Sequence, residues 1–249
     1  MTNKNFKIFA GIFGALLFVL ILFIASVDEK EYNKQKAYIT LTFDDGYEEH
    51  ITVAFPILKK HNVTATEYVI AGLIGGYFEN TKLMTTDDIK ILEDAGWEIG
   101  SHSMTHPFLT TLNDSQLTWE LEESKNILQS NKFKVNSFSV PYGDYNDRVK
   151  RKCWEHYQSV RPSLNGYNSL NNLDKYELKS KWVLNSTTLE DMKSWVDYAR
   201  DNDLGLIIML HHVSNNLSNE YTITPENLDK LIQYIKNQNI EIKTVSAII

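Results

Sequence analysis

Two adjacent carboxylates, Asp44 and Asp45, follow an apolar run over residues 37–43 that is typical of a buried strand. Like charges in neighbouring positions repel, and burial of either one is costly unless the group is paired, protonated or bound to a cation. A turn is the simple explanation, because Asp and Gly are common turn residues and a glycine follows the pair. A cation is the chemical explanation, and it requires further ligands elsewhere in the chain.

Two histidines have a spacing that suits such a cation. His102 and His106 stand four residues apart in SHSMTH, which predicts both imidazoles on one side of a helical turn. Two unrelated surface or core histidines are the alternative. Together with one carboxylate of the Asp44–Asp45 pair they give two nitrogens and one oxygen, a set that suits Zn²⁺ or a related divalent ion and leaves positions open for water. Cys153 is the only cysteine, so a thiolate cluster is excluded and a packing role is expected for it.

The remaining polar groups could complete a hydrolytic reaction. The other aspartate could take a proton from a metal-activated water as that water attacks a carbonyl carbon. His211 and His212 follow the apolar run 204–210, and an imidazole titrates in the range that a general acid needs. A polar residue at a strand end is the alternative for each histidine. The Pro-Tyr-Gly sequence at 141–143 predicts a turn whose backbone N–H groups could face a developing oxyanion.

The elements that must position these residues alternate along the chain from residue 37. Short apolar runs rich in β-branched residues alternate with amphipathic segments, which predicts parallel strands joined by crossover helices. The expected strands lie at 37–43, 64–70, 97–101, 135–140, 157–162, 204–210 and 240–245. This pattern fits an open sheet or a closed α/β barrel, and both place reactive side chains at the carboxyl ends of strands. We therefore expect the four polar clusters to meet at one rim.

The N-terminal segment predicts export from the cytoplasm. Residues 8–25 are eighteen consecutive apolar or glycine residues, which at about 1.5 Å per residue nearly cross a hydrocarbon core about 30 Å thick. Lys4 and Lys7 precede this run, so we expect a single-pass anchor with the following domain outside the cytoplasm. A cleaved signal peptide, giving a secreted protein, is the alternative. The expected organisation is an anchor or signal segment at 1–27, a linker at 28–36 and a catalytic domain at 37–249.

The motifs TFDDG, SHSMTH and LIIMLHH, in this order, resemble those of the polysaccharide deacetylases, the carbohydrate esterases of family four, over residues 37–249. The resemblance implies a distorted (β/α) barrel of about seven strands that holds a divalent metal, commonly Zn²⁺, with Co²⁺, Ni²⁺ or Fe²⁺ as alternatives. It also implies removal of N- or O-acetyl groups from sugar polymers. The implied roles are a catalytic base at Asp44, metal ligands at Asp45, His102 and His106, an acid at His211, and an oxyanion-binding backbone N–H at Tyr142.

The chain departs from the family pattern at Ser139. Many members carry an arginine there that pairs with the catalytic aspartate, so the charge partner of Asp44 stays open. Arg161, at the end of the next expected strand, is a candidate, although we expect it to be a structural surface arginine. The departure favours the subgroup that resembles deacetylases of exported poly-N-acetylglucosamine.

The sequence thus predicts a membrane-anchored, metal-dependent N-deacetylase of an extracellular or cell-wall polysaccharide that contains N-acetylglucosamine. An O-acetyl polysaccharide esterase would use the same residues. A non-catalytic glycan-binding module is a further alternative, with Tyr142, Tyr145 and Trp182 as aromatic residues that could stack on sugar rings. The net charge of −7 argues against a nucleic-acid partner. The polymer, the native metal and the oligomeric state stay open.

Overall fold

A computed structural model describes residues 36–249, which are built around a parallel sheet. Seven parallel strands follow one another across it. Their order is β7 (Ser159–Arg161), β6 (Ser137–Ser139), β5 (Glu98–Ser101), β2 (Thr66–Val69), β1 (Tyr38–Phe43), β10 (Leu204–Leu210) and β9 (Ser180–Trp182). Two short strands extend this sheet: β13 (Glu241–Ile242) pairs with the start of β1, and β8 (Asn168–Ser169) pairs antiparallel with the start of β10.

The sheet nearly closes into a barrel. In the segment that leads into β9, Lys175 O accepts a hydrogen bond from Val160 N of β7 at 2.8 Å, and Leu178 N donates to Val160 O at 3.1 Å. These bonds link the two ends of the strand order, so the sheet is a distorted, nearly closed barrel, as the sequence predicted, rather than an open sheet.

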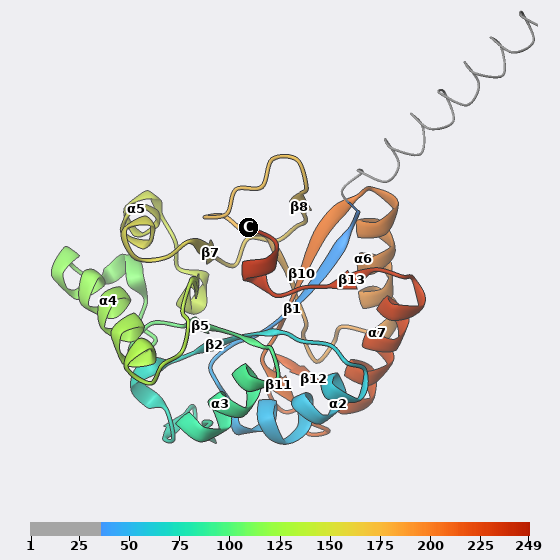
Figure 1. Cartoon of the computed structure of the whole chain (residues 1–249), viewed down its shortest axis with the longest axis horizontal. Helices are drawn as coiled ribbons and strands as arrows, with labels where there is room; N and C mark the ends of the chain where they lie inside the picture. Colours follow the sequence, from blue (N-terminus) through green and yellow to red (C-terminus); the bar gives the residue numbers. More distant parts are fainter. Residues whose placement is uncertain (1–35) are drawn as a thin grey trace, which may run out of the picture. The chain divides into compact units, whose positions relative to one another are not determined.

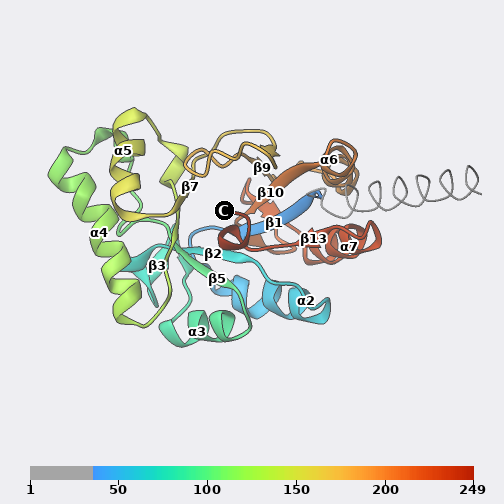
Figure 2. The same cartoon turned by 45° about the horizontal axis from the view of Figure 1, so that its top comes forward.

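Helices surround the barrel on its outside (Figures 1 and 2). α4 and α5 pack together on one side, and α6 and α7 pack together on the other. The α-helices are α2 (Phe55–Lys60), α3 (Thr86–Asp94), α4 (Asp114–Ser130), α5 (Asp147–His156), α6 (Leu189–Asp201) and α7 (Pro225–Asn237). Short turns of other helix types are η1 (His50–Ala54), η2 (Ala71–Leu73), η3 (Leu109–Thr111), η4 (Pro141–Gly143) and η5 (Val245–Ala247).

The helices begin where the sequence provides capping side chains. Thr85, Asn113 and Thr188 form reciprocal capping boxes at the starts of α3, α4 and α6. Such a cap satisfies backbone N–H groups that have no partner inside the helix. Thr and Asn are among the residues preferred at this position.

The central strands are buried on both faces, because helices cover the outside of the barrel and side chains fill its inside. All six residues of β1 are buried, and β10 is buried from its second residue onward. Gly205 of β10 lies opposite Tyr38, and a Cβ there would come within 2.2 Å of the Tyr38 ring. Cys153 is buried in the core, which confirms its expected packing role.

The sequence missed some short elements. β8 and β9 were not predicted, nor were the small pairs β3 (Tyr77–Phe78) with β4 (Thr81–Lys82) and β11 (His212–Val213) with β12 (Thr222–Ile223). The last expected strand, 240–245, has only two residues in the sheet before η5 begins. These elements have two or three residues each, too few for hydrophobic alternation to be recognised.

The predicted anchor or signal segment at 1–27 lies outside the described residues. Within residues 36–249, no helix combines the length and the apolar character that a membrane span requires.

Candidate active site

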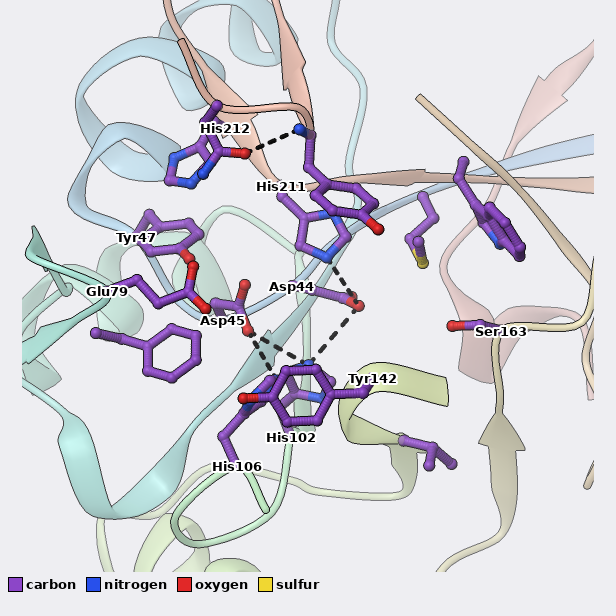
Figure 3. A pocket seen from close by; sticks show the side chains of 16 residues that line it. Asp44, Asp45, Tyr47, Glu79, His102, His106, Tyr142, Ser163, His211 and His212 are labelled. Carbon is purple, nitrogen blue, oxygen red and sulfur yellow. Dashed lines mark hydrogen bonds and ion pairs between the residues drawn. The ribbon is translucent and has the colours of Figure 1, made fainter. Parts of the chain in front are cut away.

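The polar clusters that follow β1, β5, β6 and β10 meet in one pocket at the carboxyl ends of these strands (Figure 3). The strands of a parallel barrel all end at one face, so residues at their carboxyl ends lie close together. All six predicted site residues line the pocket, together with neighbours that include Glu79, Ser163, Trp182 and His212.

Three ligand-type atoms form a nearly equilateral triangle. Oδ1 of Asp45 lies 3.4 Å from Nε2 of His102 and 3.3 Å from Nε2 of His106, and the two nitrogens are 3.2 Å apart. Ligand atoms arranged tetrahedrally at about 2.0–2.1 Å from one ion lie about 3.4 Å from each other. Oδ1 of Asp45 is buried and accepts no hydrogen bond from any residue that the structure describes. The residues therefore fit one divalent ion, and their role as its ligands stays a prediction.

The protonation of the three groups also suits a metal. Nδ1 of His102 lies 2.8 Å from the carbonyl oxygen of Ser139, which can only accept, so Nδ1 carries the proton and Nε2 presents a lone pair. Burial and the neighbouring His102 lower the pKa of His106 to about 3, so this imidazole is neutral near pH 7. Burial opposes ionisation of Asp45, but the neighbouring imidazoles, above all His102, outweigh it and lower the pKa of this carboxyl.

The two histidines do not lie on a helical turn, and the expectation that they would is wrong. Residues 102–106 form a loop in which Ser103 and His106 have φ values of 65° and 62°. A left-handed backbone is unfavourable for residues other than glycine, so other contacts must hold the loop.

Glu120 of α4 supplies those contacts. Its buried carboxylate accepts hydrogen bonds from the backbone N–H groups of Met104 and Thr105, both at 2.9 Å, and from the Thr105 hydroxyl at 2.5 Å. The sequence reasoning missed this residue. The available signal was an acidic residue within the apolar stripe of α4, next to Leu117 and Leu121, where a carboxylate has to find buried donors.

Arg161 is the charge partner of Asp44, so the expectation of a surface arginine is wrong. Arg161 is 1% exposed, and its Nη2 donates to Oδ2 of Asp44 and, at 2.5 Å, to Oγ of Ser139. Ser139 in β6 and Arg161 in β7 are direct neighbours in the sheet register. The positive charge that many family members place at position 139 thus comes from the adjacent strand.

This pairing decides the charge state of Asp44. Burial alone would raise the pKa of Asp44, but the Arg161 guanidinium and the nearby histidines outweigh it and lower the pKa below its usual value. Asp44 is therefore an ionised carboxylate beside the metal-ligand triangle, which is the state that a general base requires.

The two adjacent histidines after β10 have different surroundings. Nε2 of His211 lies 3.9 Å from Oδ2 of Asp44, and the ring faces the centre of the pocket (Figure 3). His212 also lines the pocket, but its Nδ1 lies 2.8 Å from Glu49 and its ring stacks on Tyr47 with centroids 4.1 Å apart. The structure therefore places the His211 ring, rather than the His212 ring, beside Asp44.

Within the described residues, no carboxylate accepts a hydrogen bond from Nδ1 of the His211 ring. Its Nδ1 is buried and has no hydrogen-bond partner among residues 36–249. Burial lowers the pKa of His211, although Asp44 and Asp45 oppose this effect.

Tyr142 lies at the edge of the pocket in a strained turn. Its φ of 55° and ψ of 4° are left-handed, and such backbone strain in a residue other than glycine is typical of functional sites. Its ring is 51% exposed and stacks on Phe108 at 4.2 Å. Trp182 also lines the pocket and is 38% exposed. Tyr145 is not among the pocket residues, because its hydroxyl donates to Tyr176 O at 2.7 Å and its ring packs against the core.

Comparison with known proteins gives one family. Residues 31–156 match the family model described as polysaccharide deacetylase. The peptidoglycan-N-acetylmuramic acid deacetylase PdaA of Bacillus subtilis is 40% identical over 91 residues, which are 36% of this chain and 32% of the relative. A poly-β-1,6-N-acetyl-D-glucosamine N-deacetylase of Staphylococcus aureus is 30% identical over 152 residues, which are 53% of this chain and 52% of the relative.

A longer match is the bifunctional xylanase/deacetylase of Pseudobutyrivibrio xylanivorans, 27% identical over 212 residues, which cover 84% of this chain and 30% of the relative. The chain thus spans between about a third and about a half of these curated relatives.

Solved structures share the fold. The Bc1960 peptidoglycan N-acetylglucosamine deacetylase superposes with a TM-score of 0.60 at 20% identity, covering 86% of this chain and 88% of that one. The Xyl-CE4 domain of a multidomain xylanase from the hindgut metagenome of Trinervitermes trinervoides gives a TM-score of 0.56 at 24% identity, with 86% and 90% covered.

Proposed function

The chain belongs to the polysaccharide deacetylase family, and on that basis we propose that it is a metal-dependent hydrolase that removes N-acetyl groups from a polysaccharide containing N-acetylglucosamine. The observation that carries this proposal is the buried triangle of Asp45, His102 and His106 next to an aspartate that Arg161 keeps ionised.

Each residue of the site has a role in this reaction. Asp45, His102 and His106 would hold a divalent ion, Zn²⁺ or alternatively Co²⁺, Ni²⁺ or Fe²⁺, which when bound polarises the acetyl carbonyl and acidifies a water. Asp44 takes a proton from the attacking water. The His211 imidazole, in its protonated form, donates a proton to the leaving amine nitrogen, which is otherwise a poor leaving group. The backbone N–H of Tyr142 donates to the oxyanion that develops on the acetyl group.

The pocket rim supports a sugar polymer as substrate. Tyr142, with its stacked neighbour Phe108, lies beside His106 of the ligand triangle, and Trp182 lines the same pocket; all three are exposed aromatic residues. Aromatic faces offer an apolar platform for the C–H faces of sugar rings. A non-catalytic glycan-binding module is less well supported, because stacking alone has no use for an ionised Asp44 or for His211 facing it.

The proposed location is outside the cytoplasm. The apolar run at 8–25, preceded by Lys4 and Lys7, supports a single-pass anchor in the cell membrane, with secretion after signal cleavage as the alternative. An extracellular or cell-wall polysaccharide would be accessible to the enzyme there.

Acetate release tests the proposal. The detergent-purified full chain is assayed on chito-oligosaccharides, poly-β-1,6-N-acetylglucosamine, peptidoglycan fragments and acetyl-xylan. We expect acetate from at least one N-acetylated glycan, loss of release after chelation, and recovery on addition of Zn²⁺ or Co²⁺. Release from acetyl-xylan alone would make the protein an O-acetyl esterase. No release from any substrate by the metal-loaded chain would leave the binding module as the explanation.

A further inference from the structure

His50 and Glu67 form a buried pair directly behind the candidate active site. Both side chains are 0% exposed. Nδ1 of His50 lies 3.0 Å and 3.1 Å from the two carboxylate oxygens of Glu67. Nε2 of His50 lies 2.6 Å from the backbone carbonyl oxygen of His211. The pair therefore connects β2 to the backbone of the proposed acid.

The hydrogen-bond partners fix where the protons are. A carbonyl oxygen can only accept, so Nε2 of His50 carries a proton and donates it to the His211 carbonyl. A second proton lies between Nδ1 and Glu67, on one partner or the other. The pair is neutral overall in both arrangements, which makes its burial tolerable. Burial opposes protonation of His50, but Glu67 and the His211 carbonyl outweigh it and raise the pKa of that imidazole.

The position of the pair in the fold ties it to the site. Glu67 lies beside Phe43 in the register of β1 and β2, and Phe43 immediately precedes Asp44. His50 begins η1, a π-helical turn, and π-type turns within helical segments occur frequently at functional sites. A carboxylate in a buried strand thus contacts one ring nitrogen of this histidine, and the other ring nitrogen contacts the carbonyl of His211.

The His211 ring lies against Tyr221, with ring centroids 5.0 Å apart, and its Nε2 lies 3.9 Å from Asp44, but no hydrogen bond from a described residue to the ring fixes its direction. Nδ1 of His211 has no hydrogen-bond partner in the described part of the chain, so its imidazole direction depends on how its backbone is held. On the other side of the same peptide, the backbone N–H of His212 donates to Tyr221 O at 3.0 Å, and the His212 ring lies against Glu49.

We propose that His50 and Glu67 are positioning residues for proton donation: by holding the His211 carbonyl they set the direction of the His211 imidazole toward the leaving nitrogen. This inference rests on the proposed role of His211 as the acid. Neither member of the pair lines the pocket, so substrate binding does not depend on them directly.

A matched pair of substitutions at one position tests the inference. In His50→Gln the amide nitrogen reaches about as far as Nε2 and keeps a donor for the His211 carbonyl. In His50→Asn the amide nitrogen reaches only as far as Nδ1, so it contacts Glu67 and leaves the carbonyl without its donor. Burial raises the pKa of Glu67 to about 7, so this carboxyl can become neutral in both variants.

Three readouts are measured on the metal-loaded full chain. We expect His50→Asn to lose about 10- to 100-fold in kcat on an N-acetylated glycan, with KM within about twofold of wild type, because small misplacements of a catalytic group have effects of this size. Its loss on 4-nitrophenyl acetate should be several-fold smaller, because this leaving group needs no proton. His50→Gln should stay within about fivefold of wild type on both substrates. Metal content should be unchanged in both variants.

If kcat falls equally in the two variants, or if kcat of His50→Asn falls equally on the two substrates, the pair only stabilises the fold. If His50→Asn does not fold, the double substitution His50→Leu/Glu67→Leu removes the donor without leaving a buried charge. Its losses of kcat on the N-acetylated glycan and on 4-nitrophenyl acetate are then compared in the same way.

A spectroscopic measurement separates this inference from the proposed function. Histidine-labelled NMR of the full chain should show changed His211 ring signals in His50→Asn and nearly unchanged ones in His50→Gln. That contrast stands even if the wild type releases acetate from none of the glycans. Identical His211 signals in all three proteins would overturn the inference, whatever the substrate of the enzyme.

Discussion

Arg161→Met removes the charge that keeps Asp44 ionised, and the size of the effect follows from the geometry. The guanidinium contacts Oδ2 of Asp44, and both side chains are buried. Two unit charges about 4 Å apart at an effective dielectric constant of about 20 interact by about 4 kcal/mol. At about 1.4 kcal/mol per pKa unit, loss of the arginine should raise the pKa of Asp44 by about three units. Burial is then opposed only by the neighbouring imidazoles, so the Asp44 carboxyl should titrate at a higher pH than in the wild type.

The pH profile of kcat/KM on an N-acetylated glycan is the assay. In metal-saturated Arg161→Met, the acidic limb should move to higher pH than in the wild type, so that activity at pH 5.5 is a smaller fraction of the plateau at pH 8. The wild-type limb should lie at least one pH unit lower, because Arg161 lowers the pKa of its base. Metal content is measured at each pH so that loss of the ion is not mistaken for protonation of Asp44.

Thermal unfolding gives a second readout that needs no substrate. In the wild type the pKa of Asp44 is lowered by folding, so its stabilising contribution is present above about pH 4 and is lost as the pH falls through the lowered pKa. In Arg161→Met the folded-state pKa would lie above the unfolded value. The variant should therefore lose stability as the pH rises from about 4 through its raised pKa, and the full difference between the two proteins should be about 4 kcal/mol. The Tm difference between the two proteins should widen across this window.

Two control variants distinguish loss of the positive charge of Arg161 from loss of its side-chain packing. Arg161→Lys keeps the charge, and its acidic limb should stay closer to that of the wild type. The exchange Ser139→Arg/Arg161→Ser returns the arginine to the position that many family members use, and it should restore much of the lost activity at pH 5.5. The reasoning is refuted if Arg161→Met folds, keeps its metal and shows neither a shifted limb nor a pH-dependent Tm difference.

Three further predictions concern the other site residues. Asp45→Ala should lose the metal by elemental analysis, because one of three ligands is removed, and an undiminished metal content would exclude it as a ligand. Asp44→Asn should keep the metal but lose about 10²- to 10⁴-fold in turnover, since it removes only the base; wild-type turnover would make Asp44 structural. His211→Ala should abolish amide deacetylation and spare aryl acetates, whereas His212→Ala should be mild on both because its ring lies against Glu49; a larger loss from His212→Ala would reverse the assignment.

Much of the fold and the chemical character of the site could be predicted from the sequence. Apolar runs at strand spacing predict the parallel strands, and the residue types at their ends predict where Asp44, Asp45, His102, His106 and His211 meet. This works because the alternation of a strand is local and because parallel strands bring their carboxyl ends to one rim. The family motifs lie within these same short stretches, so the resemblance could be recognised without the structure.

Only the tertiary structure determines which residues control the charge of Asp44 and contact the backbone of His211. Arg161 reaches Asp44 across 117 positions of the chain because β6 and β7 align Ser139 with Arg161, and no local pattern encodes that register. His50 contacts the carbonyl of His211 across 161 positions. The spacing of His102 and His106 predicts a helical turn, but these residues lie in a loop with left-handed backbone at two positions. A carboxylate from a later helix holds this loop, and local spacing cannot reveal such a contact. Local periodicity determines which elements form, whereas the partner of a buried charge depends on which elements pack together, and that is settled only when the whole barrel closes.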